Sequence, residues 1–360
     1  MLPSEPTKTE VSLQVNGAIY SNWKNVSIHQ SLYSISGSFD LNVTGIAQDS
    51  KVIVPLQAGD ACVVLLGKEP LITGYIDTVS KMLDATQKSI SISGRDKTGD
   101  LVDCSALASK LTWQNAPFLK IAQDLVEAFN IPILLEADAG ALFPAWHIEP
   151  GESVFNCLER AAKSRGLLLT SNGKGELVVT KAKAGSAQAS LKEGVNLLSM
   201  ASTQDIKSRF KTYQVQSHLP LELGYQMGSG FTVQAEATDK EIKRTRTLCI
   251  NADGIADKSL VQKRAEWEME VRRAKSHKLT LIVQGFRSSL GAIWKCGDSV
   301  QVESEFLGLK HPFLITSVQF QFNEQGKRTT LEVESLDAIR PDPTTQNAQN
   351  PYLKLLERDK

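Results

Sequence analysis

The densest group of residues able to do chemistry lies in the segment GRDKTGD, residues 94–100, and continues to position 103. It contains five charged side chains: Arg95, Asp96, Lys97, Asp100 and Asp103. Opposite charges this close together can pair with one another or with charges on a surface that packs against them. Two interpretations stay open: the segment is a subunit contact or a charged joint between two domains, or it is a solvated turn.

The motifs that mark common catalytic sites are absent from the sequence, namely HExxH, GxSxG, a Walker A loop and GxGxxG after a strand. Residues 171–176, SNGKGE, have the glycines of a phosphate loop, but strands flank them, which predicts a hairpin turn. A cell-wall hydrolase would need two carboxylates in a cleft, and too many carboxylates are present to select two. We therefore predict no catalytic residue, no metal site and no cofactor.

Composition excludes several further classes. Lys and Arg total 40 and so do Asp and Glu, so the chain has no global basic field for nucleic acid. The five cysteines are scattered, which predicts free thiols in a reducing compartment. The N-terminal MLPSEPTKTE lacks the apolar region of a secretory signal, and no apolar run approaches the roughly 18 residues of a membrane span.

The charged segment follows a predicted β-hairpin, and the same arrangement occurs twice. In residues 89–93 polar and apolar side chains alternate, as in a half-buried strand. The matched segments are residues 37–45 with 277–285, a Gly-Asp pair and strand at 59–66 with 297–303, and a hairpin and acidic turn at 71–104 with 311–339. This shared order predicts an internal duplication of a small antiparallel β-barrel, the first copy spanning residues 1–107.

A small α-β-α-β-β domain is predicted between the two barrels, over residues 108–185. Asn115 is the expected cap of a first helix, with Pro117 in its first turn and an apolar face that reaches Phe129. A second helix is expected at 152–165 and a tight hairpin at 167–180. The expected fold class is thus α+β.

The second barrel is predicted over residues 186–340. If strand 210–217 matches residues 26–32 of the first barrel, then residues 220–275 are an insertion that contains a densely charged helix at about 257–275. That helix is either solvated or faces another subunit or a wet channel. Residues 341–360 are expected to form a flexible tail with a short amphipathic end.

Several of these segments resemble the baseplate hub protein of Mu-like contractile phage tails. The segments are GYIDTVSKMLDATQKSISISGRDKTGDLVDCSA (74–106), FPAWHIEPGESVFNCLERAAKSRGLLLTSNGKGELVVTKA (143–182), EGVNLLSM (193–200) and RFKTYQVQ (209–216). The order of the motifs is more specific than any one of them. Residues 204–208 follow the family pattern only loosely, and the tail after residue 340 has no clear counterpart.

The resemblance implies a structural, non-enzymatic virion protein. Such hubs are homotrimers whose six barrels form a pseudo-sixfold ring that joins the tail tube to the spike. The ring surrounds a channel, so DNA is a partner only in transit, and the other partners are the spike, tube and baseplate proteins. Assembly would occur in the bacterial host cytoplasm, with no membrane segment. The T-even phage hub and the N-terminal region of type VI secretion spikes are similar in architecture. A secretion spike base and a tail-associated cell-wall hydrolase remain the alternatives.

Strand edges are the natural joining surfaces of such a ring, because strand addition satisfies backbone donors and acceptors. A contact from barrel one of a subunit to barrel two of the next is heterologous and closes into a ring if the rotation fits. We expect edge strands near residues 11–15 or 37–45, and the corresponding residues 277–285, to contribute. The candidate contact residues there are Phe39, Leu41, Leu279 and Leu281.

Overall fold

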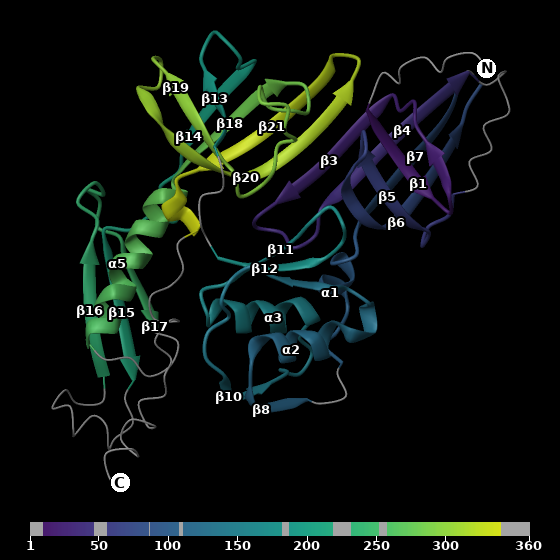
Figure 1. The fold of residues 1–360 in the computed structure, drawn as a ribbon. Coiled ribbons are helices and arrows are strands. Elements are labelled where there is room, and N and C mark those ends of the chain that lie inside the picture. The colour runs from purple at the N-terminus through teal and green to yellow at the C-terminus, as the bar shows by residue number, and fades with distance from the viewer. Residues whose placement is uncertain are drawn as a thin grey trace.

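The computed structural model describes residues 10–46, 56–85, 87–107, 111–181, 187–218, 232–251 and 258–339. The expected flexible tail at 341–360 lies outside the described residues. Most of the described chain is β-structure, and a large twisted sheet extends along the upper part of the molecule in Figure 1. A helix-containing middle region lies below this sheet, and a third unit, which contains the long helix, lies beside the middle region.

The first half of the large sheet comes from the N-terminal quarter of the chain. Its strands are β1 (Val11–Val15), β2 (Ala18–Tyr20), β3 (Asn25–Ser31), β4 (Ser38–Ile46), β5 (Ala61–Leu66), β6 (Glu69–Leu83) and β7 (Gln87–Asp96). They lie in the order β3-β4-β7-β6-β5-β1-β2. All of the pairings among them are antiparallel. The predicted hairpin at 71–95 is therefore present as β6 and β7.

The second half comes from the C-terminal part of the chain. Its strands are β13 (Ala187–Lys192), β14 (Ser199–Gln204), β18 (His277–Gln284), β19 (Ser299–Ser304), β20 (Leu309–Asn323) and β21 (Gly326–Glu334), followed by a 3-10 turn, η2 (Leu336–Ile339). They lie in the order β14-β18-β21-β20, with β19 beside the first part of β20 and β13 beside β19.

Four neighbouring strands of one half, in the order β4-β7-β6-β5, match four of the other half, in the order β18-β21-β20-β19. β6 and β20 each carry a bulge, between Ile76 and Thr78 in β6 and between Ile315 and Ser317 in β20. The preceding loops also match. The amide of Gly59 donates to the Ile76 carbonyl over 2.7 Å, and the amide of Gly297 donates to the Ile315 carbonyl over 2.9 Å. Both glycines have a positive φ, +94° and +89°, which disfavours other residues there. The predicted repetition is thus present at the level of register.

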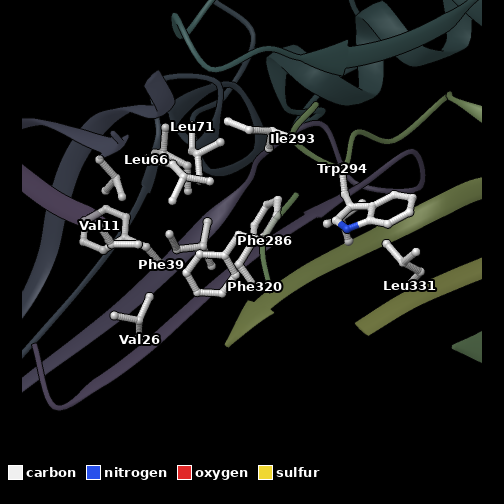
Figure 2. Packing of buried hydrophobic residues seen from close by; sticks show 14 of the residues in the cluster. Val11, Val26, Phe39, Leu66, Leu71, Phe286, Ile293, Trp294, Phe320 and Leu331 are labelled. Carbon is white, nitrogen blue, oxygen red and sulfur yellow. The ribbon is translucent and has the colours of Figure 1, made fainter. Parts of the chain in front are cut away.

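The two halves form one sheet rather than two separate ones. β3 pairs antiparallel with β20, and this pairing joins thirteen strands. The expected barrels are not closed: among the described residues the strand pairings form an open path. One apolar core extends across the junction, and Figure 2 shows Val26 and Phe39 of the first half near Phe286 and Phe320 of the second. Phe286 and Phe320 meet edge to face, with ring centroids 5.6 Å apart.

The middle region contains more elements than predicted. They are α1 (Gly99–Asp103), β8 (Thr112–Ala116), α2 (Phe118–Val126), η1 (Glu127–Phe129), β9 (Ile133–Leu135), β10 (Phe143–His147), α3 (Val154–Lys163), β11 (Leu168–Ser171) and β12 (Leu177–Thr180). Both predicted helices and the hairpin are present. The prediction of Asn115 as a helix cap is wrong, because Asn115 lies in β8 and Pro117 is the N-cap. At α3, in contrast, the Ser153 hydroxyl accepts the Asn156 amide over 3.2 Å.

The third unit is a small sheet, β16-β15-β17, with α5 (Lys258–Lys275) packed on it. Its strands are β15 (Thr212–His218), β16 (Thr232–Thr238) and β17 (Thr247–Asn251). The prediction that strand 210–217 matches residues 26–32 is wrong. Tyr213 and Val215 of β15 are buried against Val261 and Ala265 of α5, so β15 belongs to the insertion. None of the helices in the described parts of the chain is long and apolar enough to span a membrane.

Candidate functional site: a domain joint and a sheet joint

Asp96 connects the large sheet to the middle region. It ends β7, and its side chain is only 4% exposed. One carboxylate oxygen accepts the Gly37 amide over 2.7 Å and the Ser171 hydroxyl of β11 over 2.6 Å. The other oxygen accepts the Thr98 amide over 3.1 Å and also contacts the Thr98 hydroxyl. A single carboxylate therefore holds together β7, the loop before β4 and the β11–β12 hairpin.

The turn of the β11–β12 hairpin packs directly on β6. Gly173 allows this contact, since a Cβ atom there would lie 1.9 Å from the Pro70 carbonyl oxygen. The Thr73 hydroxyl donates to the Gly173 carbonyl over 2.7 Å. The side chain of Lys97 lies beside Gly175, and the Lys97 amide donates to the Thr73 carbonyl over 3.1 Å. Residues 171–176 thus form the predicted hairpin turn, and this turn is part of the joint.

Burial raises the pKa of Asp96, although the hydrogen bonds from Ser171, Thr98 and the Gly37 amide oppose the rise. Four donors surround this carboxylate, so it acts as an acceptor that fixes neighbouring segments. Such an arrangement positions two domains relative to each other. The geometry therefore indicates a structural role for Asp96.

The other charged residues of the segment lie closer to solvent. The Arg95 guanidinium binds Asp103 over 2.6 Å and Asp77 over 2.8 Å, and all three side chains are partly exposed to solvent. The pKa of Asp103 is lowered by its hydrogen bond to Arg95. Asp100 is half-buried in the first turn of α1, and desolvation raises its pKa. Arg95, Asp77 and Asp103 together carry one net negative charge at neutral pH.

The four candidate contact residues on strands β4 and β18 are not on free edges. β4 pairs with β3 and β7, and β18 pairs with β14 and β21. The expectation that these strands are edges is wrong, and β1 likewise has a partner on each side. All four side chains are buried in the apolar core of the chain, so their contacts here are within one subunit: Phe39, Leu41, Leu279 and Leu281. The alternation of apolar residues that led us to select them therefore reflects burial in the core of the chain.

The joint that does link the two halves is β3 with β20. Ser31 pairs with Ser317 at one end and Val26 with Phe322 at the other. Side chains reinforce the ladder: the His29 ring nitrogen Nε2 lies 3.0 Å from the Ser317 hydroxyl. Beyond the last pair, Tyr33 donates to Glu334 over 2.5 Å. Partial desolvation of the hydroxyl and the hydrogen bond to Glu334 raise the pKa of Tyr33 above its ordinary value. Sequence analysis missed this joint, because alternation in a strand does not identify its partner.

A buried ion pair also gives a structural role to Arg209, which belongs to one of the segments that resemble the hub family. Arg209, in the segment RFKTYQVQ, donates to Asp239 through Nε over 2.6 Å and through Nη2 over 3.2 Å. Both side chains are nearly inaccessible to solvent, and Nη2 also reaches Glu241 over 2.5 Å. The two-point geometry suits a guanidinium and a carboxylate. Arg209 therefore anchors the base of the β15–β17 sheet.

Comparisons with known proteins agree with this architecture. Family models match three parts of the chain. Residues 10–96 match the N-terminal domain of Mu phage baseplate assembly protein GpP-like proteins, 98–181 the second domain of baseplate hub protein gp44-like proteins, and 257–342 the fourth domain of Mu phage baseplate assembly protein GpP. Over 339 residues the chain is 30% identical to baseplate hub protein gp44 of Escherichia phage Mu, covering 90% of this chain and 87% of that protein. The chain belongs to the Mu-like baseplate hub family.

Solved structures show the same fold. The 43 kDa tail protein of prophage MuSo2 from Shewanella oneidensis superposes with a TM-score of 0.83 at 33% identity, covering 92% of this chain and 99% of that one. A tail protein from Neisseria meningitidis MC58 gives a TM-score of 0.79 at 24% identity, covering 93% and 98%. In this hub protein the first two matched domains meet at residues 96–98, where Asp96 and Thr98 form the joint described above.

Proposed function

We propose that three copies of this hub protein form a ring in a contractile phage tail baseplate, which joins the tail tube to the central spike and surrounds a channel for DNA. One observation carries this proposal: a single chain holds two units matched in register, joined edge to edge by β3 and β20. Three such chains present six similar units to a sixfold tube and threefold symmetry to a spike. The protein acts as a structural part, without catalysis.

In this proposal each matched unit supplies strands to the wall of the ring. The chain divides into four regions. These are residues 1–107, the middle domain at 108–185, the second barrel region at 186–340 with its insertion, and the tail at 341–360. The Asp96 joint, where β7 passes into α1, supports a division near residues 96–98, so that α1 would belong with the middle domain. Assembly takes place in the host cytoplasm before the tail is complete.

Light scattering of the purified protein over a concentration series tests the ring. We expect a mass near three times the chain mass of 39.4 kDa, and electron microscopy of that species should show a central pore. A stable dimer would contradict the proposal, since a twofold ring cannot match a threefold spike. Clearing of peptidoglycan by the purified protein in a zymogram would contradict the structural, non-catalytic role.

A further inference from the structure

The match between the two halves extends to an edge that is covered in one half and open in the other. Counting from the shared bulge, residues 78–83 of β6 correspond to residues 317–322 of β20. Residues 317–322 are the ones that pair with β3. In β6 the corresponding edge has no strand beside it among the described residues. Its last two side chains, Met82 and Leu83, are 52% and 70% exposed.

The partner strand can be matched in the same way. In the first half, Val26 of β3 pairs with Leu41, which pairs with Ile92. In the second half, Met200 of β14 pairs with Leu281, which pairs with Leu331. Because Ile92 and Leu331 occupy matched positions opposite Val79 and Val318, β14 occupies the place of β3.

β14 also has an open edge. It pairs with β18 on one side, and no other strand of the described chain lies on its second side. Exposed apolar side chains flank it, Leu198 at 52% and Ile206 at 40%. The residues that match Leu83 and Ile206 inside the chain are Phe322 and Leu32, and both are partly buried there. Open strand edges with apolar side chains invite pairing with another strand.

We propose that residues 78–83 of β6 in one protomer pair antiparallel with β14 of its partner, in the register of β3 with β20. In this register Leu83 faces Met200 and Ser80 faces Thr203, as Phe322 faces Val26 and Gln319 faces His29 inside the chain. The contact is heterologous, so each protomer uses both surfaces once and the assembly can close. The inference rests on the proposed ring and adds its strand-level contact.

Charges at the end of the joint fit this register. Inside the chain Tyr33 of one half donates to Glu334 of the other. By the same matching, Tyr33 corresponds to Lys207 and Glu334 to Arg95. Arg95 is bound to Asp77 and Asp103, and this group carries one net negative charge. The exposed ammonium group of Lys207 lies 3.9 Å from the Asp205 carboxylate of its own chain. In this register it approaches Arg95 of the partner together with the two carboxylates bound to Arg95, so each charge at this end of the joint has an opposite charge beside it.

Disulfide trapping between two differently tagged chains tests the register. One chain carries Ser80→Cys and the other Thr203→Cys, both in a background with the exposed Cys104 and Cys249 replaced by serine. Directly opposed residues on paired strands lie within disulfide reach. Oxidation of the mixture should give a mixed dimer band on a non-reducing gel. Ser80→Cys mixed with Ser202→Cys is the matched control, because a slip of one residue places the side chains on opposite faces.

Each outcome of this experiment either supports or contradicts the proposed contact. A mixed disulfide at the predicted pair, at least about tenfold above the slipped pair, supports the contact. A trimer by light scattering with no mixed disulfide would overturn this contact while leaving the ring proposal in place. A Ser80→Cys homodimer would show a twofold β6–β6 contact and overturn both. A protein that stays monomeric at every concentration and forms no mixed disulfide would also overturn the contact, since it needs only a second copy.

A surface substitution provides an independent readout. Leu83→Asp places a carboxylate opposite Met200 of the partner and should weaken self-association by about tenfold or more. Leu290→Asp is the control, because Leu290 is 73% exposed and its loop contacts the opposite end of β6, where Arg287 binds Glu69. It should change association by less than about twofold. Leu83→Asp that associates like the wild type would contradict the contact, and circular dichroism of both variants checks that they fold.

Discussion

Asp96 makes a clear prediction at the scale of single residues, because its buried carboxylate satisfies donors from three segments. Replacement by alanine leaves the Gly37 and Thr98 amides without an acceptor in a dry environment. Asp96→Ala should lower the free energy of unfolding by roughly 2–4 kcal/mol. Urea unfolding followed by circular dichroism measures this. Asp103→Ala removes an exposed ion pair from the same segment and should cost less than about 1 kcal/mol. Equal losses in the two variants would contradict the assignment.

The raised pKa of Asp96 adds a pH dependence with a definite sign. The native state binds the proton of this carboxyl more tightly than the unfolded chain, whose value is near 3.8. Its contribution to stability is complete below that pH and is lost as the pH rises through the raised pKa. The unfolding free energy of the wild type minus that of Asp96→Asn should therefore fall from about pH 4 upward and then level off. A difference that is constant with pH would contradict a raised pKa.

At the scale of elements, burial explains which predictions from sequence succeeded. β7 alternates polar and apolar residues because one face lies on the core, and its position was predicted well. β14 was missed because SMASTQ has one large apolar residue, Met200, and its side chains are mostly exposed in a single chain. β15 was predicted as a strand but assigned to the wrong sheet, because its apolar face serves α5. A strand whose side chains are mostly exposed gives a weak pattern in its own sequence.

The charged segment shows the same limit. Its composition located the joint, but only the fold separates buried Asp96 from partly exposed Arg95 and exposed Asp103. Ser171, which donates a hydrogen bond to Asp96 across the joint, lies 75 residues from Asp96 in the sequence. Side-chain type and spacing cannot report a contact of that range without the fold.

The β15–β17 sheet is an element whose stability depends on one ion pair. Arg209 and Asp239 are both nearly inaccessible to solvent, so removing Arg209 leaves the Asp239 carboxylate without its cation in a buried site. Arg209→Ala should destabilise this unit by about 3–5 kcal/mol. Hydrogen exchange should show faster exchange confined to β15, β16 and β17, while β3 and β20 stay protected. Lys243→Ala, at an exposed position nearby, is the control and should leave the exchange of these strands unchanged. Faster exchange across the large sheet would contradict a local role.

At the scale of the whole molecule, the two matched joints differ in one respect. The β3–β20 joint is formed within the chain, so it does not depend on protein concentration. The proposed β6–β14 joint brings two chains together and must follow mass action. A ring built from both would therefore open at the joint between chains while each protomer remains folded. Apolar and backbone contacts dominate this joint, so it should persist in salt that screens surface charges.

Hydrogen exchange as a function of concentration distinguishes the two joints. Outward-facing amides in residues 78–83 and in β14 should exchange rapidly in dilute protein and at least about tenfold more slowly in the assembled form. Amides in β3 and β20 should be protected equally under both conditions, because their ladder is intramolecular. The edge strand β2 (Ala18–Tyr20) is the internal control, since within the described part of the chain it pairs only with β1 and has no place in the proposed contact. If β2 gains protection on assembly while residues 78–83 do not, the protomers join through the other end of the sheet.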